Sequence, residues 1–254
     1  MLPRACLLLI TAVALSGCAG SGTRRSPSTA DDAQRAAEVN LELGQGYMRR
    51  GDNKIALEKL QNAIRLDPNS AAAHTVIAVL YERLGLQDKA EQYFQRSVEL
   101  APENGEILNN FGTHLCRRQR YAEADALFVR ALKDPFYPTP AALLGNAGSC
   151  ALQAGNAVQA EAYFRRALQH NARQPQSLYQ LAQIELEKGN ALSARAFIQR
   201  YEAVAPASPQ LFELGARIET VLGDSEAAAN YRSRLRTEFP DYQPTTASGG
   251  ATSP

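Results

Sequence analysis

The residues with the widest chemical range in this chain are its cysteines and histidines. The 254 residues include four cysteines and three histidines. His74, His114 and His170 are far apart, and none has a cysteine, histidine or carboxylate partner at the spacing of a metal site. The sequence therefore predicts no metal centre, and we expect each histidine at the surface or at a helix boundary.

Thiol chemistry at Cys116 and Cys150 is the enzymatic alternative. Neither cysteine belongs to a C-x-x-C motif, the usual signature of a thiol oxidoreductase. The chain also lacks a G-x-S-x-G nucleophile motif. These observations favour a protein that is not an enzyme and has no small-molecule substrate, although reactive thiols in the folded chain would support an oxidoreductase.

Cys18 directly follows an apolar stretch. Residues 1–17 hold one positive charge, Arg4, and then the nearly uncharged run ACLLLITAVALSG. That run is shorter than the ~20 residues of a membrane-spanning helix and fits a secretory signal peptide. The ending LSGC resembles the lipobox of bacterial lipoproteins, which implies cleavage before Cys18 and a diacylglycerol on its thiol. The alternative is an ordinary signal peptide with a coincidental cysteine.

The lipobox resemblance also implies a location. Ala19 stands after the cysteine, where an aspartate usually marks inner-membrane retention, so the resemblance implies an anchor in the outer membrane, on its periplasmic face. Each buried methylene of the lipid contributes about 0.8 kcal/mol, so the chain is expected to be anchored without spanning the membrane. The lipid on Cys18 is the only bound group predicted, and no cofactor is expected.

The charge of the chain without its signal peptide is balanced. Removal of residues 1–17 subtracts one arginine and no acid from 27 basic and 26 acidic residues, which leaves 26 of each. This balance argues against nucleic acid or an anionic lipid surface as the main partner. Residues 18–36 and 243–254 are rich in Gly, Ser, Thr and Pro, so we expect a flexible tether and a disordered tail.

Between those ends the sequence repeats itself every 34 residues, with one interval of 36. The repeat is clearest at six alanines, namely Ala56, Ala90, Ala124, Ala160, Ala194 and Ala228. The residues four positions later are Leu60, Phe94, Phe128, Phe164, Ile198 and, out of line, Arg232. Where two helices cross closely, a larger side chain would hold them apart. The repeated alanine therefore predicts that each unit is a closely packed pair of helices.

The second unit illustrates the two helices. Ile77, Leu80 and Leu84 have helical spacing, and Gly85 suits the left-handed residue that ends a helix. Pro102 then stops the second helix, because proline lacks an N–H and clashes with the preceding turn. The unit resembles the tetratricopeptide repeat, although no unit has the tryptophan of the consensus.

The predicted fold is therefore all-α: a right-handed solenoid of about six tetratricopeptide helix pairs in one elongated domain. The predicted repeats are 37–70, 71–104, 105–140, 141–174, 175–208 and 209–242. Coiled coils and globin-like bundles are alternatives, but neither predicts a 34-residue period. Because the first helix of every pair lines a concave surface in such stacks, the architecture favours binding over catalysis.

Cys116 and Cys150 fall late in the first helices of adjacent repeats, and such helices pack side by side. A disulfide is feasible if the two Cα atoms come within about 7 Å. The alternative is a pair of small buried thiols, which behave as hydrophobic residues. A bond would join the third repeat to the fourth, where the longer interval interrupts the period.

The longer interval also carries a resemblance to a narrower family. Residues 131–150 read ALKDPFYPTPAALLGNAGSC. The DP-x-YP-x-P insertion followed by N-x-G-x-C resembles the type IV pilus biogenesis lipoproteins, which are the pilotins of the pilus secretin. The resemblance covers residues 18 to about 242. Some members have paired cysteines at these places, so the resemblance implies the Cys116–Cys150 disulfide.

That resemblance implies an outer-membrane scaffold that binds the secretin subunit, helps to deliver it to the outer membrane and promotes its multimerisation. Other pilus components are further candidate partners. The alternative function is a scaffold for another envelope machine, such as outer-membrane protein assembly or peptidoglycan-enzyme recruitment. The partner that co-purifies from membranes would distinguish the two.

Candidate contacts for a protein partner lie on the inner faces of the first helices in the early repeats. They are Leu41, Gln45, Met48, Val79, Asn109 and Thr113. Arg49, Arg83 and Arg117 recur 34 residues apart and are suited to a basic ladder for a carboxylate. The alternatives are a solvated charged edge for the arginines and burial between helices for the apolar residues.

Overall fold

Helices alone form the part of the chain that is described. The computed structural model describes residues 29–243, which contain α-helices and no strands. The first helices of the pairs are α1 (Thr29–Arg50), α3 (Ala71–Arg83), α5 (Gly105–Arg117), α7 (Pro140–Gln153), α9 (Pro175–Glu187) and α11 (Pro209–Leu222). The second helices are α2 (Asn53–Leu66), α4 (Gln87–Leu100), α6 (Tyr121–Ala131), α8 (Ala157–His170), α10 (Ala191–Glu202) and α12 (Ser225–Glu238). The all-α repeat prediction is confirmed.

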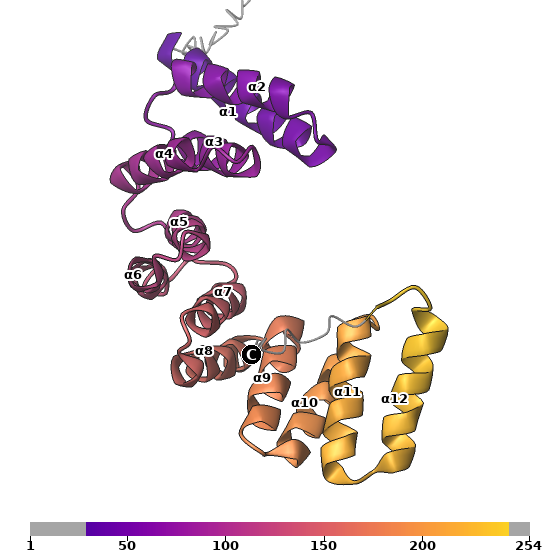
Figure 1. The fold of residues 1–254 in the computed structure, drawn as a ribbon. Helices are drawn as coiled ribbons and strands as arrows, with labels where there is room; N and C mark the ends of the chain where they lie inside the picture. The colour runs from indigo at the N-terminus through magenta and orange to yellow at the C-terminus, as the bar shows by residue number, and fades with distance from the viewer. Residues whose placement is uncertain (1–28, 244–254) are drawn as a thin grey trace, which may run out of the picture.

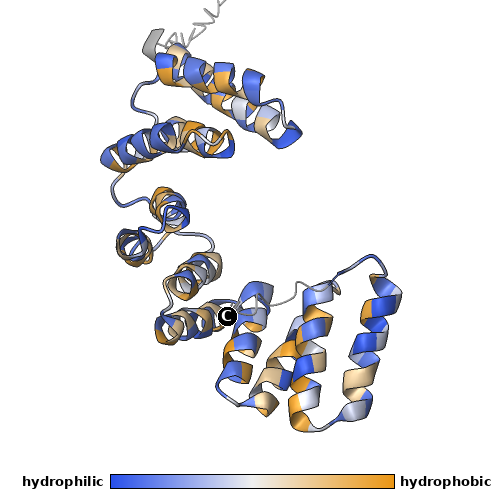
Figure 2. Cartoon of the chain, viewed as in Figure 1, coloured by the Kyte–Doolittle hydropathy of each residue, from blue (hydrophilic) through white to orange (hydrophobic). Residues whose placement is uncertain are grey.

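The helix pairs stack into an arc, with α3, α5 and α7 toward its inner side (Figure 1). Each helix packs mainly against the other helix of its pair and against helices of the adjacent pairs. Within residues 29–243, the main contacts between helices do not extend beyond adjacent pairs. Figure 2 shows hydrophilic and hydrophobic residues on different sides of the helices, which is the pattern of an amphipathic helix with one buried face. The stack thus buries a core that continues from repeat to repeat.

The two helices of each pair meet at the repeated alanine. All six of these alanines are at most 1% exposed, as are the apolar side chains four residues later in the first five repeats. The fourth repeat shows how close this contact is, because a Cβ atom added to Gly148 of α7 would lie 2.7 Å from Cε1 of Phe164 on α8. That space admits no side chain without movement of the ring.

The sixth repeat keeps this close contact but shifts it by one residue. Arg232, which departs from the sequence pattern, is exposed. Tyr231 takes the aromatic place instead, since a Cβ atom added to Gly215 would lie 2.7 Å from its ring. The register of the last pair therefore differs by one residue from the alanine-based alignment.

The turn between the paired helices uses a left-handed residue, as the sequence predicts at Gly85, where φ is +76°. The third repeat keeps the left-handed turn but has no glycine there, because Gln119 occupies it with φ of 61°. A side chain in that conformation costs roughly 1–2 kcal/mol. The second helix of the second repeat ends at Leu100, just before Pro102, in agreement with the predicted stop.

The first helix begins earlier than the sequence pattern indicates. Helix α1 starts at Thr29, so residues 29–36 of the predicted tether are helical. This stretch contains several alanines, and Asp31 and Asp32 lie in the first turn, where negative charge stabilises a helix N-terminus. The lipid site at Cys18, the rest of the tether and nearly all of the predicted tail lie outside the described residues. Among the helices of residues 29–243, none has the length and apolarity needed to cross a membrane.

The insertion forms an ordered connection between α6 and α7. Asp134 accepts a hydrogen bond of 2.8 Å from the Gly105 N–H at the start of α5. Tyr137 packs against the core, whereas its neighbour Phe136 is 89% exposed. The additional residues thus cover the start of the third repeat and hold one aromatic side chain in solvent.

Candidate functional site: the groove of the first three repeats

A groove runs along the inner side of the first three repeats. It has a volume of about 530 Å³ and is lined by side chains of α1, α3 and α5. Five of the predicted contact residues lie in it, namely Gln45, Met48, Arg49, Val79 and Arg83. The floor is formed largely by α3, whose small residues Ala71 and Ala72 leave room above the helix. A concave surface of this size is suited to a segment of another protein.

Four other predicted contacts do not line this groove, namely Leu41, Asn109, Thr113 and Arg117. Leu41 is half-buried and packs against the core. Asn109 is buried and accepts a hydrogen bond of 3.2 Å from Nδ2 of Asn146. Thr113 donates its hydroxyl hydrogen to the Asn109 carbonyl over 2.8 Å. Leu41, Asn109 and Thr113 therefore make contacts within the helix stack. For Leu41 this agrees with the alternative prediction that the apolar residues are buried between helices.

Helix α5 contributes different residues to the groove. They are Glu106, Ile107 and Asn110. None of them was predicted, although the period contains the signal, because Glu106 and Asn110 lie 34 residues after the groove residues Ala72 and Val76. The inner face of α5 is thus rotated slightly from the one predicted.

The arginine ladder is not uniform. Arg83 donates a hydrogen bond to the main-chain carbonyl of Met48, at the end of the neighbouring helix. Arg117 forms an ion pair of 2.6 Å with Glu82. Arg49 is exposed and has no hydrogen-bond or ion-pair partner among the described residues. Two of the three guanidinium groups therefore also join adjacent repeats, and Arg49 retains its full capacity for a ligand.

Glu82 links the second repeat to the third. One carboxylate oxygen lies 2.9 Å from Nδ1 of His114, and the other accepts from Arg117. Burial alone raises the pKa of Glu82, but the hydrogen bonds from His114 and Arg117 outweigh burial, so the pKa lies below its ordinary value of 4.5. The ionised carboxylate is therefore the form that stabilises this contact.

Two histidines are more buried than a surface position would allow. His114 lies in the last turn of α5, as a helix-boundary residue should, but is fully buried against Glu82 and Phe94. His74 is also buried, and its Nε2 lies 3.0 Å from the Pro68 carbonyl oxygen. The expected surface position is correct for His170, which is exposed.

The Glu82 contact predicts a pH dependence of stability. A carboxyl group whose folded-state pKa is lowered stabilises the fold above its unfolded-state pKa, and this contribution is lost as the pH falls through the folded-state pKa. We expect wild type to be more stable than Glu82→Gln near neutral pH and the difference to shrink between about pH 5 and pH 3. Thermal melts across this range measure it. The matched control is Glu226→Gln at an exposed position on α12, and a Glu82→Gln difference that stays constant with pH would contradict the prediction.

The two cysteines lie where a disulfide can form. Cys116 of α5 and Cys150 of α7 have Cα atoms 5.7 Å apart, within the range of a disulfide, and both residues are buried. This position is at the junction of the third and fourth repeats. The pair therefore fits a covalent link between the two halves of the stack.

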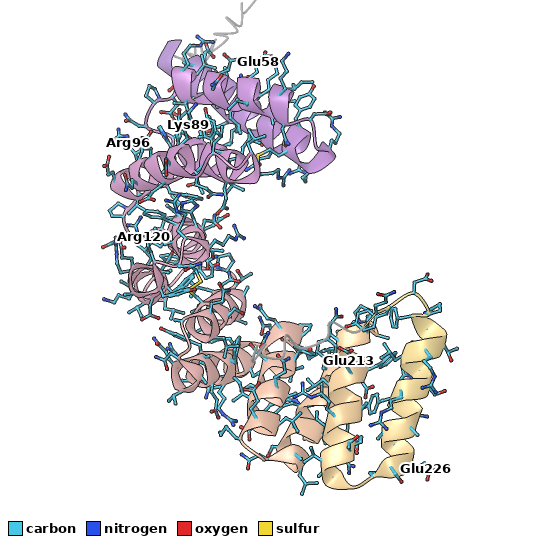
Figure 3. The ribbon with its side chains drawn as sticks, viewed as in Figure 1. Glu58, Lys89, Arg96, Arg120, Glu213 and Glu226 are labelled. Carbon is cyan, nitrogen blue, oxygen red and sulfur yellow. A yellow bond between two sulfur atoms is a disulfide. The ribbon has the colours of Figure 1, made fainter. Side chains whose placement is uncertain are left out.

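The remaining buried charges have structural partners. Glu185 accepts from Arg165 over 2.6 Å, and Glu219 pairs with Arg195. Other charged side chains, such as Arg96 and Glu226, point outward from the second helices (Figure 3). No group of three or more histidine, cysteine, aspartate or glutamate side chains within residues 29–243 is arranged to hold a metal ion. The groove is therefore the arrangement best suited to a ligand.

Comparison with known families identifies the class. Models of the tetratricopeptide repeat match residues 41–105 and 109–177, and a second model of the same repeat matches residues 151–218. The chain is a tetratricopeptide repeat protein, a scaffold class that is generally non-catalytic.

Individual relatives narrow the family. The type IV pilus assembly protein PilF of Pseudomonas aeruginosa is 32% identical over 184 residues, which cover 72% of this chain and 73% of the relative. A crystal structure of PilW, described as a widely conserved type IV pilus biogenesis factor, shares 32% identity with a TM-score of 0.74 and covers 82% of this chain and 95% of that one. A structure of the Pseudomonas aeruginosa PilF gives a TM-score of 0.77 at 27% identity, with 83% and 95% coverage. This chain belongs to the tetratricopeptide repeat family of type IV pilus biogenesis proteins.

Proposed function

We propose that this protein is a lipid-anchored pilotin of the outer membrane, which binds the type IV pilus secretin and promotes its localisation and multimerisation. The observation that carries the proposal is the relationship to PilF, a type IV pilus assembly protein, over nearly three quarters of both chains. The sequence LSGC before and at Cys18 supports a lipid anchor. The groove of the first three repeats supports the binding of a protein segment.

The anchor and the groove would act together. A lipid on Cys18 keeps the chain at the membrane, and the groove starts at Gln45, only 27 residues further along. A secretin subunit held there is confined near the membrane and near other bound subunits, which raises its effective concentration for assembly. No step in this process requires bond-making chemistry by the scaffold. Other pilus components could bind the rest of the arc.

The disulfide belongs to the same proposal. The periplasm is an oxidising compartment in which cysteine pairs persist as disulfides. Cys116 and Cys150 would then be bonded and would hold the third and fourth repeats together. The bond would thereby support α5, which forms one wall of the groove.

The proposed function is tested by the amount of heat- and detergent-resistant secretin multimer in outer membranes. A strain lacking this gene should contain secretin monomer but little multimer, and the wild-type gene should restore it. The variant Cys18→Ser should fold normally, be absent from outer-membrane fractions and restore less multimer, because it lacks the lipid that retains it. An unchanged amount of multimer in the deletion strain would reject the pilotin function, and outer-membrane fractionation of Cys18→Ser would reject the anchor.

The alternative is a scaffold for outer-membrane protein assembly or for recruitment of a peptidoglycan enzyme. It would use the same anchor and groove with another partner. Co-purification from detergent-solubilised membranes separates the two functions, because the proposed one requires the secretin subunit among the bound proteins. The family relationship favours the secretin.

A further inference from the structure

The groove has a direction. Arg83 at the end of α3 bonds to the Met48 carbonyl near the end of α1, and Glu82 near the end of α3 pairs with Arg117 at the end of α5. The C-terminal ends of these three helices are therefore together, and their N-terminal ends lie at the opposite end of the groove. Arg49 and Arg83 give one end positive charge, whereas Glu106 lies near the start of α5 at the other end.

The middle of the groove combines apolar contacts with free amides. Val76 and Val79 of α3 lie between Met48 of α1 and Ile107 of α5. Two carboxamide side chains accompany them. They are Gln45 and Asn110, which are half-buried and have no hydrogen-bond partner among the described residues. Side-chain amides beside an apolar strip can form hydrogen bonds with the main chain of a bound segment, provided that the segment's own main-chain groups are not already bonded to one another.

We infer that the groove binds an extended segment with an acidic residue at the Arg49–Arg83 end and apolar residues over the valines of α3. An extended segment fits better than a helix, because a helix satisfies its own main-chain groups and would leave Gln45 and Asn110 unpaired. Ala72 to Arg83 spans roughly 16 Å of helix, which matches about five extended residues. The inference rests on the proposed function in one respect, namely that the segment belongs to the secretin.

The acidic residue is the specific element. A carboxylate between two guanidinium groups forms charge-assisted hydrogen bonds, which are stronger than neutral ones. Arg49 is the better probe of this contact, because Arg83 already bonds to the Met48 carbonyl and its replacement would also disturb the stack. Arg166, on the second helix α8, is exposed and, like Arg49, has no ion-pair partner among the described residues, so it provides a matched control.

The test uses the full mature protein in detergent and an array of overlapping peptides that covers the secretin. We expect the bound peptides to contain an acidic residue within about five residues of an apolar pair, and Arg49→Glu to weaken their binding at least tenfold. Arg166→Glu should bind as wild type. Exchange of the peptide's acidic residue for lysine should weaken binding to wild type and restore part of the binding to Arg49→Glu.

The outcomes separate this inference from the proposed function. If wild type and Arg49→Glu bind the same peptides equally, the acidic anchor is wrong, while secretin binding stands. If no secretin peptide binds and a random array of acidic and apolar peptides still shows the Arg49 dependence, the groove is assigned correctly and the partner is not the secretin. Absence of binding in both arrays overturns the inference. If Arg166→Glu also loses binding, the effect of Arg49→Glu comes from the overall charge of the protein, and the inference is overturned.

Discussion

Replacement of Phe164 by alanine is expected to lower the free energy of unfolding by about 3–5 kcal/mol, because it leaves a cavity in a closely packed position. The ring is fully buried between α7 and α8, at the point where these two helices of the fourth repeat cross. Chemical denaturation monitored by far-ultraviolet circular dichroism measures the change. A loss below about 1 kcal/mol would show that the repeat closes around the missing ring and that the crossing is not rigid.

Gly148, opposite that ring, provides a control, because its replacement by alanine should have opposite effects on stability with and without the ring. Gly148→Ala should destabilise wild type, because the new Cβ meets the Phe164 ring, but should be tolerated or favourable in Phe164→Ala. The matched variant is Gly46→Ala in α1, where the nearest atom is the flexible end of Arg49 at 3.8 Å. It should stabilise the protein by roughly 0.5–1 kcal/mol, since alanine is the better helix former. Equal effects of Gly148→Ala in both backgrounds would contradict the packing argument.

Replacement of both Cys116 and Cys150 by serine is expected to cost about 3–4 kcal/mol, the value for a disulfide that closes a loop of about 35 residues. The two cysteines are 34 residues apart in the sequence, and the Cα geometry permits the bond. The measurement is the melting temperature of the purified protein under oxidising conditions. A melting temperature equal to that of wild type would contradict the disulfide as a source of stability.

Reduction of the wild-type protein controls for the serine substitutions. If the bond carries the stability, wild type in excess reductant should melt close to the double-serine variant, and that variant should not respond to reductant. A variant that melts well below reduced wild type would attribute the loss to the buried hydroxyl groups instead. The comparison also tests whether the two cysteines are bonded in the protein as isolated.

The sequence predicted the stack because the residues that determine the stack recur with the period. Ala124 and Phe128 of α6, for example, occupy the same places as Ala90 and Phe94 of α4, and all four are buried. The start of α1 at Thr29 was missed for a local reason: the eight residues before the predicted repeat, 29–36, extend the helix although they lie outside the period. The shift to Tyr231 in the last repeat was missed because one substitution there conceals the register.

The site was predicted less completely than the fold. Gln45, Met48 and Val79 line the groove, because the repeat period places them on the inner faces of α1 and α3. Asn109 was assigned to the groove but is buried against the next repeat, where it bonds to Asn146. Contacts between repeats, such as that of Glu82 with His114, join residues 32 positions apart and change from one junction to the next. A period alone cannot specify them.

The confinement of contacts to adjacent repeats has a consequence for the order of folding. Every residue assigned to the groove lies between Gln45 and Asn110, and the helices that bear them pack against neighbours no later than α7. Arrays of this kind become stable once about three repeats are present. A chain that folds from its N-terminus can therefore complete the groove while the last repeats are still unfolded. Under the proposed function, capture of a partner can then begin before the fold of the scaffold is finished.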